Sequence, residues 1–116
     1  MVKKKILIAE DQQDTAEFLG RILKRRGHEV NIASDGLQAK DFIDSRQFDI
    51  LFLDCSIPGM TGFELVKYAR EHNPAARIIV FTGYNIIDEK LAEDLGADEF
   101  LRKPINPEEI EKICDY

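Results

Sequence analysis

The chain has 116 residues, of which 44% are hydrophobic and 33% are charged, and its formal net charge is −6. This length suits a single domain with its own hydrophobic core, and the negative charge argues against binding to nucleic acid or to an anionic membrane surface. The two cysteines lack the spacing of a metal site or a disulfide framework, and no apolar run approaches the roughly 20 residues of a membrane span. We therefore expect one cytoplasmic domain over residues 1–116.

The first half of the chain predicts two strand–helix units. The apolar run ILIA at residues 6–9 indicates a buried strand, and a helical stripe in residues 14–28 ends at Gly27 after three basic residues. The segment EVNIA at residues 29–33 alternates between apolar and polar residues, which suits a strand at a sheet edge. A turn, SDG, then leads into a helix over residues 35–45.

The second half of the chain predicts three further units. Residues 50–53 (ILFL) and 78–81 (IIVF) are continuous apolar runs, whereas residues 99–101 (EFL) form a weaker strand. Continuous apolar runs are typical of strands that are buried on both faces of a parallel sheet. The helices that follow these strands are expected at residues 62–74, 86–97 and 106–116.

Five alternating strand–helix units predict an α/β domain with an open, doubly wound sheet and helices on both faces. In such a sheet, ligands bind beyond the carboxyl ends of the strands, where the strand order reverses. The residues that follow the strands are therefore the candidates for function. They are Glu10 and Asp11 after the first strand, Asp54 after the third, Thr82 and Gly83 after the fourth, and Lys103 after the fifth.

Three of these candidates are carboxylates, and they would meet if the first and third strands were neighbours. Three carboxylates so placed repel one another unless a cation lies among them. Oxygen ligands favour Mg²⁺ over a transition metal. With Lys103, the Thr82 hydroxyl and the Gly83 N–H nearby, this pattern predicts a site in which the carboxylate of Asp54 attacks a phosphoryl group.

The segments ILIAED, LFLDCSIPGMTG, IIVFTG and EFLRKP together resemble the receiver domain of two-component response regulators, over essentially the whole chain. The resemblance implies a flavodoxin-like (βα)5 fold with a five-stranded parallel sheet in the order 2-1-3-4-5. It implies that Asp54 takes its phosphoryl group from a phosphohistidine on a sensor histidine kinase or a histidine phosphotransfer protein. Such a domain catalyses only its own phosphorylation and dephosphorylation, so we expect a signalling phosphoacceptor and not an enzyme in the usual sense.

The resemblance also implies roles for the residues around Asp54. Asp11, Asp54 and the backbone carbonyl of Ser56 would bind Mg²⁺, and Glu10 would act mainly through a metal-bound water. Lys103 would hold a phosphoryl oxygen. The Lys103–Pro104 peptide bond is expected to be cis, an isomer that is accessible almost only before proline.

Two further pairs of residues are expected to govern the response. Thr82 would move its hydroxyl toward the phosphoryl group and draw Phe100 inward, which would rearrange the face made by the fourth helix, fifth strand and fifth helix toward a partner protein or an output domain. For Phe100, a purely structural role as a core aromatic is the alternative. Ser56 and Tyr84 would tune the lifetime of the phosphoryl group, Tyr84 by shielding it from water.

Other classes of protein fit the sequence less well. A dehalogenase-type phosphatase needs a second acid two residues after its nucleophile, where this chain has Ser56, and an FMN-binding protein needs a first loop less acidic than EDQQD. A pseudo-receiver, which binds partners without being phosphorylated, remains the main alternative. The sequence leaves open the cognate kinase, the oligomeric state, and whether the chain is a stand-alone regulator or one domain of a longer protein. By resemblance, a kinase would dock on the first predicted helix, near Gln12, Gln13 and Thr15, beside Ile105.

Overall fold

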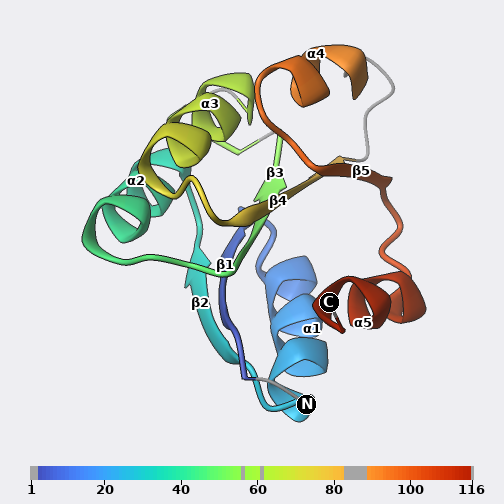
Figure 1. Ribbon diagram of the computed structural model, residues 1–116. Helices are drawn as coiled ribbons and strands as arrows, with labels where there is room; N and C mark the ends of the chain where they lie inside the picture. Colours follow the sequence, from blue (N-terminus) through green and yellow to red (C-terminus); the bar gives the residue numbers. More distant parts are fainter. Residues whose placement is uncertain (1–2, 56, 61, 83–88, 116) are drawn as a thin grey trace.

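The computed structural model describes residues 3–55, 57–60, 62–82 and 89–115 (Figure 1). Within these residues, strands and helices alternate along the chain as the sequence pattern predicted. The elements are β1 (Lys5–Ala9), α1 (Gln13–Arg25), β2 (Glu29–Ala33), α2 (Gly36–Ser45), β3 (Ile50–Asp54), α3 (Gly62–His72), β4 (Arg77–Thr82), α4 (Glu89–Asp94), β5 (Glu99–Arg102) and α5 (Pro107–Cys114). The predicted start of the fourth helix, at residues 86–88, lies outside the described residues.

The strands form one parallel sheet in the order β2-β1-β3-β4-β5, which confirms the predicted flavodoxin-like topology. The alternating strand, β2, lies at one edge. In the sheet register, Ala9 at the end of β1 pairs with Leu53, and Asp54 at the end of β3 pairs with Phe81. The carboxyl ends of β1 and β3 therefore lie side by side.

Helices cover both faces of the sheet: α1 and α5 lie on one face, and α2, α3 and α4 lie on the other (Figure 1). Alternate residues of each central strand contribute to different cores. Leu51 and Leu53 of β3 pack in the core under α2 and α3, whereas Ile50 and Phe52 pack in the core under α1 and α5. Every residue of β3 is buried, which explains its continuous apolar run and makes its last residue, Asp54, a rigidly mounted side chain.

Side chains at the helix ends agree with the local sequence signals. The Asp35 carboxylate accepts a hydrogen bond from the Gln38 N–H at the start of α2, and Asn106 caps α5 in the same way through the Glu108 N–H. Gly27 follows α1 with a φ of 87°. No helix in the described part of the chain combines the length and apolar character that crossing a bilayer requires.

Candidate functional site

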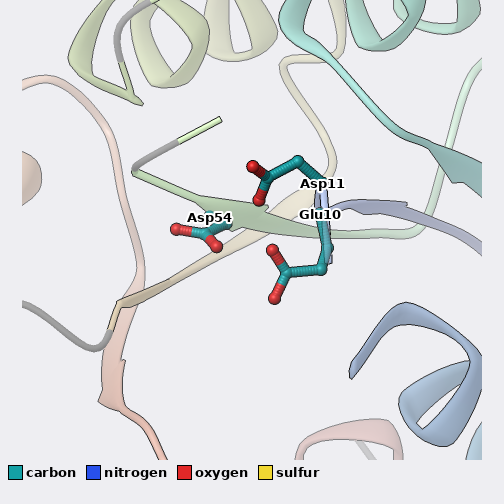
Figure 2. A group of neighbouring side chains, drawn as sticks. All are labelled: Glu10, Asp11 and Asp54. Carbon is teal, nitrogen blue, oxygen red and sulfur yellow. The ribbon is translucent and has the colours of Figure 1, made fainter. Parts of the chain in front are cut away.

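Three carboxylates come together where β1 and β3 end. Glu10 and Asp11 lie in the loop after β1, and Asp54 is the last residue of β3 (Figure 2). Each side chain offers an oxygen atom that lies within 4.8 Å of the oxygens offered by the other two. The parallel register of β1 and β3 produces this arrangement, because it brings both strands to the same edge of the sheet.

Two of these carboxylates are buried, and a single lysine lies against them. Glu10 is 1% exposed and Asp54 is 2% exposed, whereas Asp11 is exposed. Lys103, in the loop between β5 and α5, donates hydrogen bonds to Glu10 Oε1 at 2.5 Å and to Asp54 Oδ2 at 3.0 Å. The peptide bond between Lys103 and Pro104 is cis. In the described part of the chain, the site therefore joins residues from three strand ends, and its lysine contacts two of the three acids.

The surroundings of Glu10 shift its pKa. Burial, followed by the hydrogen bond with Asp54, raises this pKa to about 7, although Lys103 acts in the opposite direction. Burial alone would lower the pKa of Lys103, but its hydrogen bonds to Glu10 and Asp54 outweigh burial and raise it. The lysine therefore stays charged beside the two buried carboxylates.

These residues fit a hard divalent cation. The ligand atoms available are carboxylate oxygens, which Mg²⁺ and Ca²⁺ prefer, and the cluster contains neither histidine nor cysteine. A divalent cation among them would favour the ionised form of Glu10, against the burial and the neighbouring Asp54 that raise its pKa. Within the described residues, this is the one group of potential ligand side chains close enough to share an ion.

The remaining predicted site residues lie around this centre to different extents. Thr82 ends β4, one position beyond the partner of Asp54 in the register. Phe100 in β5 is half-buried and packs against the core under α2 and α3, with the Arg102 guanidinium 5.5 Å from its ring centroid. These contacts fit a purely structural role for Phe100 in the core, which is the alternative to a role in switching. Ser56, Gly83 and Tyr84 lie outside the described residues.

A surface cavity beside the site contains one residue that the sequence interpretation missed. It has a volume of about 310 Å³ and is lined by residues of α1 and of the β5–α5 loop, namely Asp14, Thr15, Phe18, Lys103, Pro104 and Ile105. The docking region expected from the sequence included Thr15 and Ile105 but not Phe18, whose side chain is 44% exposed. An aromatic residue outside the buried stripe of Ala16, Leu19 and Leu23 was the available signal.

Comparison with known proteins identifies relatives of this chain. The family model described as the response regulator receiver domain matches residues 6–115. Sporulation initiation phosphotransferase F from Bacillus subtilis is 33% identical over 111 residues, which are 95% of this chain and 90% of that protein. Three further curated relatives are longer proteins, and this chain covers 42% or less of their length.

Solved structures give the same grouping. A response regulator from Burkholderia pseudomallei, crystallised with a phosphorylated aspartic acid, a calcium ion and citrate, has a TM-score of 0.88 and 33% identity over 94% of this chain and 65% of that chain. The response regulator TrrA from Thermotoga maritima, in complex with Mg²⁺ and BeF, has a TM-score of 0.86 and 29% identity over 97% of this chain and 96% of its own. Both neighbours are therefore known with a divalent cation.

Proposed function

The chain belongs to the response regulator receiver domain family, and from this premise we propose that it is a Mg²⁺-dependent phosphoacceptor that takes a phosphoryl group onto Asp54. The observation that carries the proposal is the placement of the Asp54 carboxylate. It is buried at the end of a rigid central strand, and it lies among two other acids and a lysine. The phosphorylated aspartic acid of the Burkholderia pseudomallei neighbour supports the same chemistry.

The metal would be held by Asp11, Asp54 and the backbone carbonyl of Ser56, with Glu10 beside them. Bound Mg²⁺ supplies positive charge that neutralises the oxygens of the phosphoryl group during transfer. Lys103 would supply a second positive charge, because its ammonium group already donates to both Glu10 and Asp54. The Mg²⁺ complex of TrrA supports the choice of ion.

The transfer itself needs one nucleophile and one leaving group. A carboxylate oxygen of Asp54 attacks the phosphorus of a phosphohistidine, so that an O–P bond forms while the P–N bond breaks. The imidazole leaves with the electron pair of the broken bond and takes up a proton. Lys103 then holds a phosphoryl oxygen through its ammonium group, and the Gly83 N–H donates to another.

The response to phosphorylation would follow from Thr82 and Phe100. The Thr82 hydroxyl would turn toward the phosphoryl group, and the half-buried Phe100 ring would move inward. This change would alter the face formed by α4, β5 and α5, to which a downstream partner protein or an output domain would bind. We place this activity in the cytoplasm and in a single domain over residues 1–116.

The phosphoryl donor would be a sensor histidine kinase or a histidine phosphotransfer protein. Its docking surface would be the cavity beside the site, where the exposed Phe18 ring offers apolar area next to Lys103 and Ile105. Docking there would bring a phosphohistidine to the edge of the sheet at which Asp54 lies.

Incubation with Mg²⁺ and acetyl phosphate, followed by intact-mass spectrometry, tests the proposal. We expect a single phosphoryl increment that requires Mg²⁺ and is lost in Asp54→Asn. If the wild-type protein gains no phosphoryl group under conditions that label another receiver domain, the chain is a pseudo-receiver that binds partners without being phosphorylated.

Tyr84 would set how long the phosphoryl group persists, because its bulk would shield the acyl phosphate from water. We expect faster loss of the label from Tyr84→Ala than from the wild type after acetyl phosphate is removed. An unchanged decay would assign Tyr84 to the loop alone. Ser56 would be the second residue that tunes this lifetime.

A further inference from the structure

The ammonium group of Lys103 lies over the ring of Phe81, with its Nζ atom 5.4 Å from the ring centroid. The face of an aromatic ring carries partial negative charge and attracts a cation within about 6 Å, more strongly where the pair is shielded from water. Phe81 is 2% exposed and the Lys103 side chain is 19% exposed, so this pair is largely shielded. The ring therefore attracts Lys103 in addition to the carboxylates of Glu10 and Asp54.

The Phe81 ring has a fixed place in the fold. Phe81 lies in β4, pairs with Asp54 in the sheet register, and accepts a hydrogen bond from the Cys55 N–H through its carbonyl. Its side chain packs in the core under α1 and α5, together with Ile110. An aliphatic side chain would also bury apolar area there, but it would present no negative face to a cation. The ring therefore offers Lys103 a contact that core packing alone does not require.

In the proposed function, the hydrogen-bond partners of Lys103 change during phosphoryl transfer. The ammonium group would have to share the carboxylate oxygens with a divalent cation, and like charges repel. Phosphorylation would then alter the Asp54 carboxylate itself. Lys103 also lines the surface cavity that Asp14 borders, so another carboxylate is available to an ammonium group that leaves the site. The contact with the Phe81 ring depends on neither of these changes.

We propose that Phe81 is a positioning residue for phosphoryl transfer, and that its ring keeps the Lys103 ammonium group at Asp54 while the other partners of that group change. The inference rests on the proposed function, in which Lys103 holds a phosphoryl oxygen. Because Phe81 acts through Lys103, its loss should lower the rate of transfer and leave the affinity for Mg²⁺ nearly unchanged.

Phe81→Leu is the direct test, because leucine keeps an apolar side chain in the core and removes the ring. We expect phosphorylation by acetyl phosphate at saturating Mg²⁺ to slow roughly fivefold, the scale of a partly shielded cation–π contact. The Mg²⁺ concentration that half-saturates the reaction should stay within about twofold of the wild type. Phe81→Met fills core space with a flexible side chain and no ring, so it should show the same loss and keeps the test decisive if Phe81→Leu does not fold.

A second mutation separates a role through Lys103 from a purely structural role. In the Lys103→Met background the ammonium group is absent, so Phe81→Leu should slow phosphorylation no further, whereas two independent losses would multiply. Phe48→Leu is the matched control, because Phe48 is also a buried aromatic, 5% exposed, but lies in the loop before β3 at the opposite edge of the sheet. It should lower the melting temperature and leave the phosphorylation rate unchanged.

The outcomes separate this inference from the proposed function. If the wild type is phosphorylated but Phe81→Leu and Phe81→Met react within about twofold of its rate, the ring does not position the lysine and the inference is wrong. If Phe81→Leu slows Lys103→Met by the same factor as the wild type, or if the control slows as much as Phe81→Leu, packing is the cause and the inference is also wrong. If the wild-type protein accepts no phosphoryl group, the proposed function fails together with the inference.

Discussion

The central sheet has one edge where its strands begin and one where they end, and charged groups are paired differently at the two. At the edge where the strands begin, acidic groups have partners: Asp49 accepts from the Lys5 N–H at 2.7 Å, and Asp98 accepts from the Ile78 N–H at 2.8 Å. Across the β4–β5 pair, Arg77 forms an ion pair with Glu99. At the edge where the strands end, the described residues include three clustered carboxylates, and Lys103 donates to two of them, Glu10 and Asp54.

The charges where the strands begin stabilise the fold, whereas those where the strands end serve another purpose. Two adjacent buried acids do not stabilise a fold through their charges, because burial and the neighbouring Asp54 carboxylate both disfavour the ionisation of Glu10. Such an arrangement persists where activity depends on it, at some cost in stability. The proposed function therefore locates that cost at Glu10 and Asp54, and substitutions at both edges test whether they differ as described.

Removing Lys103, the cation that the described residues place at the site, should have the largest effect. Lys103→Met removes the ammonium group that donates to Glu10 and Asp54 and that would hold a phosphoryl oxygen. We expect phosphorylation by acetyl phosphate to slow by about 100-fold, the loss typical of removing one group that stabilises a developing charge. Phosphoryl incorporation measured against time at saturating Mg²⁺ gives this number.

Lys40→Met is the matched control for that experiment. Lys40 also lies near a carboxylate, with its Nζ 3.3 Å from an oxygen of Asp44, but both side chains are well exposed on α2. Its removal should leave the phosphorylation rate unchanged and have little effect on stability, because an exposed ion pair contributes little. A rate in Lys103→Met within threefold of the wild type would contradict the role given to this lysine.

A substitution at the edge where strands begin should lower stability and leave activity unchanged. Asn73 is fully buried, and its side chain accepts from the Phe48 N–H at 2.7 Å while donating to the Ile43 and Arg46 carbonyls. Asn73→Ala leaves these backbone groups without partners, so the free energy of unfolding should fall by about 3 kcal/mol. Urea denaturation measures the loss, and calorimetry should find Mg²⁺ affinity unchanged. A large fall in Mg²⁺ affinity would mean that the two edges are not independent.

Neutralising one acid should change the stability of the protein in opposite directions at the two edges. The pKa of Glu10 is raised to about 7, so its contribution to stability is present at acidic pH and is lost as pH rises through 7. Glu10→Gln cannot ionise, and without metal at pH 8 it should be more stable than the wild type, by on the order of 1 kcal/mol. The gain should disappear near pH 4.5.

Glu99→Gln makes the same change in an acid that has an arginine partner. It should lose a small amount of stability at pH 8, because it weakens the ion pair with Arg77. Thermal melting of both variants in EDTA at pH 8 and pH 5 supplies the comparison. Equal signs for the two substitutions at pH 8 would contradict the proposed difference between the edges.

Much of the fold could be predicted from the sequence because its signals are local. Continuous apolar runs, helical stripes and caps such as Asp35 and Asn106 each act over a few residues, and the structure contains the corresponding strands and helices. The convergence of Glu10, Asp11 and Asp54 was also predictable, since the position of each relative to its strand end fixes the edge at which it lies.

Long-range contacts were not predictable in the same way. The approach of Gly36 to Met60, the exposure of Phe18 and the buried hydrogen bonds of Asn73 depend on how distant segments pack. A glycine after an aspartate predicts a turn whether or not another chain segment lies against it. Likewise, the sequence could not indicate that Glu10 would be buried and Asp11 exposed, although the two are adjacent.

The smallest expected effect concerns His28, a buried titratable group at the edge where strands begin. Its ring is 5% exposed, and its Nδ1 accepts a hydrogen bond from the Lys4 N–H. Burial, together with the nearby positive charges of Lys4 and Arg26, lowers its pKa below the ordinary value of 6.5, and Asp115 only partly opposes this. Folding therefore favours the neutral ring, so stability is lost as pH falls below 6.5.

His28→Gln should remove that part of the pH dependence, because glutamine keeps a hydrogen-bond acceptor but does not titrate. We expect the wild type to lose more unfolding free energy than His28→Gln between pH 7.5 and pH 5. His72→Gln, which removes the other histidine from an exposed position on α3, should retain the wild-type loss. If His28→Gln and the wild type lose stability in parallel, then His28 is protonated in the fold without cost. The edge where strands begin would then hold an unmatched charge as readily as the site does, and unmatched charge would no longer distinguish the two.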